Sequence, residues 1–80
     1  MGYRVTVFAG LRDHFEQSFL IENDHPISIS DFCEALIEKK PNAASILKAC
    51  RFAVNETFVN GNYQLNDNEH VYIIPPSSGG

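Results

Sequence analysis

The sequence predicts an α+β domain in which one main helix packs across a mixed β-sheet. Three observations lead to this prediction. The N-terminal residues alternate in hydrophobicity as a strand does, residues 29–40 carry apolar side chains at helical spacing, and residues 51–74 contain short apolar runs separated by turn residues. A chain of 80 residues has room for one such domain with a modest core, since a domain of this size buries about 60 to 65% of its unfolded surface.

The first two strands are expected to form a hairpin. Along residues 3–9 the odd-numbered positions are apolar and share one face, while Phe8 falls on the opposite, outer face. Residues 10–14 are expected to turn the chain. Residues 15–22, with an apolar centre, are then expected to return antiparallel to the first strand.

The main helix is expected to run from Ser28 to about residue 40. Ser28 and Asp31 form a helix-start signature in which each side chain accepts a hydrogen bond from an otherwise unpaired backbone N–H. Pro41 then prevents the helix from continuing. The apolar stripe that should face the core consists of Ile29, Phe32, Cys33, Leu36 and Ile37.

The rest of the chain is expected to add a short helix and three strands. Residues 42–50 favour a helix capped by Asn42, and strands are expected over residues 51–55, 57–59 and 70–74. The main helix provides the crossover that lets the first and last strands lie parallel at the centre of the sheet. This order of elements is the ubiquitin-like β-grasp arrangement.

The last strand leads into a short tail. Pro75 and Pro76 cannot donate ladder hydrogen bonds, so strand pairing is expected to stop before them. Residues 1–74 are therefore expected to form the domain and residues 75–80 a flexible arm that carries the α-carboxylate of Gly80. The slim end of this arm consists of Ser77, Ser78, Gly79 and Gly80.

Composition limits the classes of partner. The chain has ten acidic and six basic side chains, a formal net charge of −4 and no Lys/Arg cluster, which argues against nucleic acid and favours a basic partner surface. No apolar run approaches the roughly 20 residues of a membrane span, and no signal-peptide pattern opens the chain. We therefore expect no membrane association and a cytoplasmic location.

The cysteines and histidines do not indicate a metal site. Cys33 and Cys50 are isolated among apolar neighbours and are expected to be reduced core thiols. His14, His25 and His70 lie far apart without Cys or carboxylate groups at ligand spacing, so no metal ion is expected.

A docking patch is expected on the outer face of the sheet. Phe8, Phe58 and Ile74 should lie on neighbouring strands and point away from the helix, beside the tail. Arg12, expected at the sheet edge, would add a polar contact. The alternative is that Phe58 is partly buried under the loop of residues 60–65.

The whole chain resembles the molybdopterin synthase small subunits, a family of ubiquitin-like sulfur carriers. A terminal Gly-Gly alone is shared with ubiquitin and with the thiamine-pathway carrier, whereas the double proline favours the molybdopterin branch. The turn at residues 68–70 departs from the family, which commonly has Gly or Asp there. The resemblance rests on Phe8-Ala9, Ala53-Val54-Asn55-Glu56, Leu65-x-Asp67-x-x-x-Val71 and Ile74-Pro75-Pro76-Ser77-Ser78-Gly79-Gly80.

The resemblance implies a function for the tail. An ATP-dependent activating enzyme adenylates the carboxylate of Gly80, and a sulfur donor converts it to a thiocarboxylate. The chain then donates sulfur to a cyclic pyranopterin precursor of the molybdenum cofactor, as the small subunit of a heterotetrameric synthase. The resemblance implies no cofactor bound to this chain and places the catalytic acids and bases on the large subunit.

Three other functions stay open from the sequence. A sulfur carrier for thiamine synthesis or tRNA thiolation would differ only in its partners. A ubiquitin-like modifier would form isopeptide bonds through Gly80. A plain interaction module would have an inert tail, so it would keep its activity when the terminal glycines are deleted.

Overall fold

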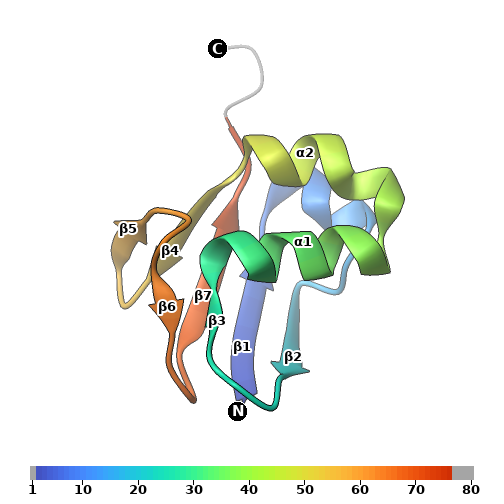
Figure 1. The fold of residues 1–80 in the computed structure, drawn as a ribbon. Coiled ribbons are helices and arrows are strands. Elements are labelled where there is room, and N and C mark those ends of the chain that lie inside the picture. The colour runs from blue at the N-terminus through green and yellow to red at the C-terminus, as the bar shows by residue number, and fades with distance from the viewer. Residues whose placement is uncertain (1, 77–80) are drawn as a thin grey trace.

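The computed structural model describes residues 2–76, and its centre is a five-stranded mixed sheet with the order β2-β1-β7-β4-β5 (Figure 1). β1 and β7 are parallel neighbours in the middle, and the other strand pairs are antiparallel. The predicted β-grasp sheet is confirmed. Its strands are β1 (Gly2–Val7), β2 (Ser18–Glu22), β4 (Arg51–Val54), β5 (Thr57–Val59) and β7 (His70–Ile74).

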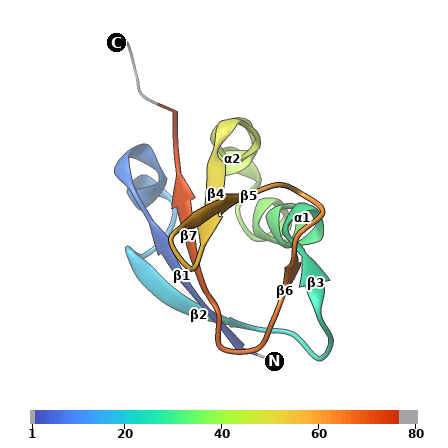
Figure 2. The ribbon, with the colours of Figure 1, turned by 90° about the vertical axis from the view of Figure 1, so that its left-hand side faces the viewer.

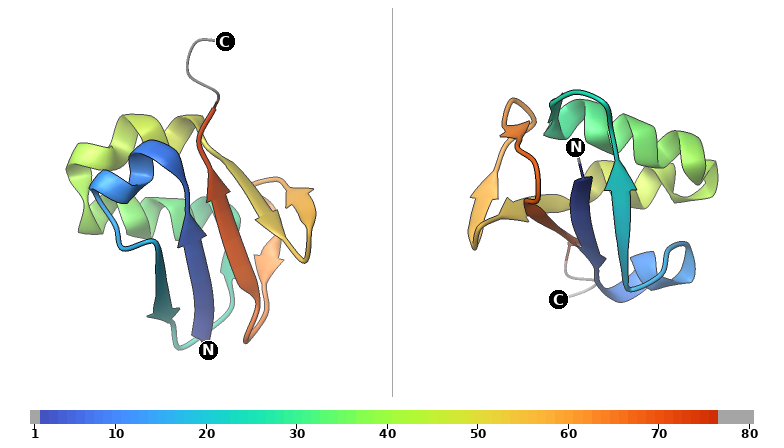
Figure 3. Two further views of the ribbon diagram at one scale, coloured as in Figure 1. Left: turned by 180° about the vertical axis from the view of Figure 1, so that it is seen from behind. Right: turned by 90° about the horizontal axis from the view of Figure 1, so that it is seen from below.

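The two α-helices, α1 (Ile29–Lys39) and α2 (Ala44–Ala49), lie on one side of this sheet (Figure 2). Seen from behind, the sheet stands in front of the helices, and no described element covers its other face (Figure 3, left). We call this uncovered side the outer face. The remaining elements are η1 (Ala9–Asp13), β3 (Ile27–Ser28), η2 (Pro41–Ala43) and β6 (Gln64–Leu65), of which η1 and η2 are 3₁₀ helices.

The core lies between the sheet and the helices. The ring of Tyr3 meets that of Phe32 edge to face, with the ring centroids 6.3 Å apart. The predicted helix stripe is confirmed at its centre, while Cys33 and Ile37 lie at its partly buried margin. The largest fully buried side chains are Tyr3, Phe32, Leu11, Leu36, Leu47, Leu65, Ile73, Val5, Val7, Val54 and Val71.

Local signals predicted the start of α1 correctly and the start of α2 wrongly. The hydroxyl of Ser28 accepts a hydrogen bond from the Asp31 N–H at 3.1 Å, as a capping residue does. Asn42 does not cap α2, because Pro41 starts the 3₁₀ turn η2 and Asn42 lies inside it. The residue that precedes α2 is Ala43, which makes no side-chain cap.

The connection from β1 to β2 is longer than predicted. Residues 9–13 form η1 instead of a simple turn, and the buried Leu11 anchors that helix to the core. Phe15 donates its N–H to the carbonyl oxygen of Leu11 at 3.0 Å, so it still belongs to the exit of η1. β2 therefore begins at Ser18 and not at residue 15.

Two turns require left-handed backbone conformations. Asn55 and Glu56 have φ of 53° and 64°, which confirms the tight turn predicted between β4 and β5. Asn68 has φ of 68°, and asparagine is one of the few residues other than glycine that accept this conformation.

Candidate functional site

The root of the tail lies at the end of the central strand β7. β7 ends at Ile74, and Pro75 and Pro76 are in no strand, so pairing stops where the prolines were expected to stop it. Residues 77–80, including the predicted reactive carboxylate of Gly80, lie outside the described residues. The site that can be described is therefore the surface around Ile74.

The strand register brings the predicted patch residues onto the outer face. Tyr72 lies opposite Ala53, and Ala53 lies opposite Phe58 on its other side. Residues directly opposite each other point to the same face of a sheet, and residues two apart on a strand do so as well. Phe58, Tyr72 and Ile74 therefore share the outer face. Phe8 joins them, because its ring stacks on that of Tyr72 with the centroids 6.3 Å apart.

Phe58 is the most exposed part of this patch. Phe58 is 50% exposed and belongs to the exposed residues, whereas Phe8 and Ile74 are less exposed and only partly accessible to solvent. In the loop of residues 60–65, the carbonyl groups of Gly61 and Tyr63 accept hydrogen bonds from the first residues of α1, at 3.0 and 2.9 Å. The alternative that Phe58 is partly buried under this loop stays a prediction, because these contacts tie the loop to α1 and not to Phe58.

Arg12 does not lie at the sheet edge. It is an exposed residue in the last turn of η1, beyond the end of β1, whereas the edges of the sheet are β2 and β5. The chain leaves the sheet after Val7 and passes through Ala9, whose φ is 52°. Because β1 and β7 are parallel, η1 still follows the strand end that lies beside the root of the tail.

Further residues of the outer face were absent from the predicted patch. His70 stacks on Tyr72 with centroids 4.2 Å apart, and its Nε2 lies 2.7 Å from the Thr6 hydroxyl. Burial, with a smaller contribution from the charge of Arg4, lowers the pKa of His70. Leu20 on β2 is 67% exposed. The alternation along β7 was the signal that could have identified His70 and Tyr72 as neighbours on this face.

Arg51 is also on the outer face and was not expected there. It lies directly opposite Ile74, at the root of the tail. Its guanidinium carbon is 3.9 Å from the centroid of the Phe58 ring, the geometry of a cation–π contact. The patch beside the tail therefore contains a cation as well as apolar side chains.

A groove of about 630 Å³ lies between the helices and β5, and both cysteines line it. Each is a free thiol, as predicted. The Cys50 thiol is 3.0 Å from the carbonyl oxygen of Ile46, and burial raises its pKa to about 11. Burial also raises the pKa of Cys33. Neither thiol is activated as a nucleophile, because the reactive form is the thiolate.

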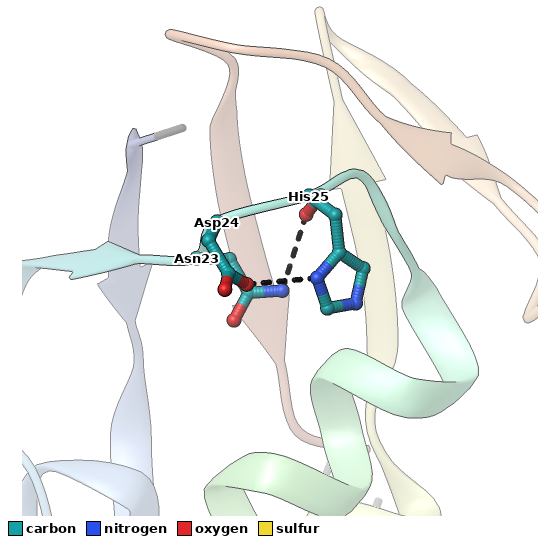
Figure 4. Close-up of polar contacts among 3 residues, drawn as sticks. All are labelled: Asn23, Asp24 and His25. Carbon is teal, nitrogen blue, oxygen red and sulfur yellow. Dashed lines mark hydrogen bonds and ion pairs between the residues drawn. The ribbon is translucent and has the colours of Figure 1, made fainter.

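The polar cluster of Asn23, Asp24 and His25 is a local feature of the connection between β2 and β3 (Figure 4). His25 Nδ1 lies 2.8 Å from the carboxylate of Asp24, and Asn23 donates to the His25 carbonyl at 3.2 Å. The hydrogen bond from His25 lowers the pKa of Asp24. Within residues 2–76, no group of three or more potential ligand side chains could hold a metal ion.

None of the helices formed by residues 2–76 is both long and apolar enough to cross a membrane.

Solved structures share this fold over nearly the whole chain. SAMP1 from Haloferax volcanii is 16% identical with a TM-score of 0.83, and the match covers 100% of both chains. A putative molybdopterin converting factor subunit 1 from Pyrococcus furiosus is 20% identical with a TM-score of 0.81, over 95% of this chain and 98% of that one. These two similarities establish the β-grasp fold.

A third similar structure is a complex of subunits 1 and 2 of molybdopterin-converting factor from Helicobacter pylori. It is 25% identical with a TM-score of 0.71, and the match covers 100% of both chains. No curated protein gave a significant match. The sequence profile of the ThiS family matches residues 5–80, which is nearly the whole chain. The chain therefore belongs to the ThiS family of ubiquitin-like sulfur carriers.

Proposed function

We propose that this sulfur carrier serves molybdenum cofactor synthesis as the small subunit of a molybdopterin synthase. The observation that carries the proposal is the family match over residues 5–80, which includes the terminal Gly-Gly. The double proline before the tail and the similarity to the Helicobacter pylori complex favour the molybdopterin pathway over other uses of a sulfur carrier.

The proposed chemistry takes place at the carboxylate of Gly80. A carboxylate is a poor electrophile, so an activating enzyme first joins it to the AMP part of ATP and releases pyrophosphate. Sulfur delivered by a donor at the oxidation level of sulfide then attacks the acyl carbon, displaces AMP and leaves a thiocarboxylate. Transfer of that sulfur to the pterin precursor and hydrolysis by water restore the carboxylate, so two carrier turnovers supply the two sulfur atoms of a dithiolene.

Tethering explains why the sulfur travels on a protein. A sulfur atom at the end of an arm reaches a high effective concentration at one place, which free sulfide in solution does not. The end of the proposed arm contains two glycines, so it fits a channel that excludes larger side chains. The large subunit would supply this channel and the acids and bases of the reaction.

The burial and the raised pKa values of the two cysteine thiols support a carrier that holds sulfur on its C-terminal carboxylate. The thiols of Cys33 and Cys50 are partly buried, and their pKa values are raised. A cysteine that accepts and releases sulfur needs an accessible thiolate near neutral pH. The described thiols lack this property, which leaves the terminal carboxylate as the group best suited to hold sulfur.

The outer face is the surface proposed for docking. The patch formed by Phe8, Phe58, Tyr72 and Ile74 lies at the end of the sheet from which the tail departs. A partner that covers this patch receives the tail at a fixed position. The activating enzyme and the large subunit would therefore bind in turn and not together.

The test is the intact mass of the protein during a complete reaction. The protein is incubated with ATP, a sulfur donor and an activating enzyme, and the large subunit and pterin precursor are then added. We expect a mass increase that corresponds to replacement of oxygen by sulfur, followed by its disappearance as product forms. A variant without Gly79 and Gly80 is the control and should show neither step.

The other outcomes identify the competing functions. A thiocarboxylate that forms but is not consumed would contradict the role in molybdenum cofactor synthesis and indicate thiamine or tRNA thiolation. Conjugates to lysine residues of other proteins would indicate a ubiquitin-like modifier. Full activity of the truncated variant would indicate an interaction module with an inert tail.

A further inference from the structure

The outer face carries a positive charge beside the root of the tail, although the chain as a whole has a formal net charge of −4. Arg4 and Arg51 lie on this face, opposite His70 and Ile74 respectively. The only carboxylate in the five strands of the main sheet is Glu22, which pairs with Gly2 at the end remote from the root of the tail. Glu22 and Asp67 line one hollow together with Arg4, so negative charge offsets Arg4 at that remote end, whereas Arg51 lies beside the root of the tail.

The position of Arg51 reverses the expectation about the partner's charge that was based on the net charge of the chain. An acidic chain was expected to favour a basic partner surface. A partner that covers the outer face beside the root of the tail would meet Arg51, and the one carboxylate of the five strands, Glu22, lies at the other end. Because exposed charges more than about 10 Å apart are largely screened at ordinary ionic strength, the local charge decides and the net charge does not.

Arg51 is the cation best placed to contact such a partner. It lies opposite Ile74, and its guanidinium carbon is 3.9 Å from the centre of the Phe58 ring. Within residues 2–76 the only contact at ion-pair distance joins Asp24 and His25, so no described carboxylate lies at that distance from Arg51. A guanidinium that lies on an aromatic ring keeps its in-plane N–H donors available.

Docking of a partner would change the hydration of Arg51. A partner that covers Phe58 and Ile74 also removes water from Arg51, which lies between them on the adjoining strand. A charge that loses its water without gaining a partner strongly opposes binding. A carboxylate is the group that best replaces this water, because it accepts two parallel hydrogen bonds from a guanidinium.

We propose that Arg51, held against Phe58, binds a carboxylate of the large synthase subunit, so that the docking surface of that subunit is apolar and acidic. The inference rests on the proposed function, which identifies the large subunit as a partner of this face. Arg51 would then determine specificity, because an apolar surface without the carboxylate would have to dehydrate the guanidinium without replacing its hydrogen bonds.

The test measures the dissociation constant for the large subunit by calorimetry at low and high salt. We expect Arg51→Gln to raise the constant at least about 10-fold at low salt and to weaken its salt dependence. Arg51→Lys should restore only part of the affinity, because an ammonium group cannot make the same pair of parallel hydrogen bonds. Lys39→Gln removes the same charge from the last turn of α1 and should change the constant less than about 2-fold.

Two results would overturn the inference. One is an Arg51→Gln variant that binds as tightly as the unmodified protein. The other is an equal loss of affinity in Lys39→Gln, because the effect would then be one of net charge. Circular dichroism should show that every variant is folded, since Arg51 and Lys39 are both exposed.

The proposed function can fail separately from this inference. If the unmodified protein forms a thiocarboxylate but does not bind the large subunit, the synthase role is wrong. The Arg51 variants are then compared as substrates of the activating enzyme. A KM for the carrier at least about 10-fold higher in Arg51→Gln would support recognition of a carboxylate by Arg51, and an unchanged KM would overturn it.

Discussion

Substitution of Phe58 by alanine or aspartate is expected to weaken docking while the domain stays folded. Phe58 lies on the edge strand β5, is 50% exposed and is not a member of the buried core. A phenylalanine buries about 200 Å² when fully covered, so docking on Phe58 would bury about 100 Å² more. At about 25 cal/mol per Å² this corresponds to about 2.5 kcal/mol, or roughly a 60-fold change in Kd.

The two substitutions separate apolar area from charge. Phe58→Ala removes the ring and leaves Arg51 unpaired, so its loss should approach the area-based value. Phe58→Asp also places a carboxylate beside Arg51, where it would compete with the partner's carboxylate, and its loss should be at least as large. Binding to the large subunit and to the activating enzyme is measured by calorimetry.

Leu20→Ala is the matched control. Leu20 is 67% exposed on the same face, but β2 is the edge strand on the other side of the sheet. We expect less than about a 3-fold change in Kd, because surface away from the centre of an interface contributes little. If Phe58→Asp bound both partners with unchanged affinity while folded, the reasoning about the patch would be refuted.

Further predictions concern stability. Leu36→Ala removes a fully buried side chain from the middle of α1 and should lower the free energy of unfolding by about 2 to 5 kcal/mol in urea titrations; a loss under about 1 kcal/mol would contradict this packing. Glu56 has a left-handed conformation with φ of 64°, which glycine adopts without strain. Glu56→Gly should therefore raise the free energy of unfolding by about 0.5 to 1 kcal/mol, whereas Glu56→Val should lower the free energy of unfolding. Burial and the charge of Arg4 lower the pKa of His70 in the folded state, so the unfolded state binds the proton more tightly. The His70 contribution to stability is therefore complete above the unfolded pKa of about 6.5 and decreases as the pH falls through it toward the lower folded pKa. Urea titrations at several pH values should show a smaller decrease over this window in His70→Gln, and an identical pH dependence would contradict the assignment.

Local patterns predicted the elements whose signals lie within a few residues. The alternation in residues 3–9 correctly separated the buried face of β1 from the outer face as far as Val7, and the alternation in residues 71–74 did so for β7, but Ala9 is exposed because the chain has already entered η1. The cap at Ser28 and the tight turn at Asn55–Glu56 were predicted because each depends on neighbouring atoms only. The pair β3–β6 was missed, since two strands of two residues are too short to show a period.

The sequence by itself determined the fold class, the break after β7 and the family of the chain. It also identified Phe8, Phe58 and Ile74 as outward residues, because parity along a strand is a local property. Only the tertiary structure decided that Arg51 lies beside Ile74 and Phe58 on the outer face, and that Arg12 belongs to η1. These features depend on the register between strands distant in sequence, and register follows from the packing of the whole core rather than from any single segment.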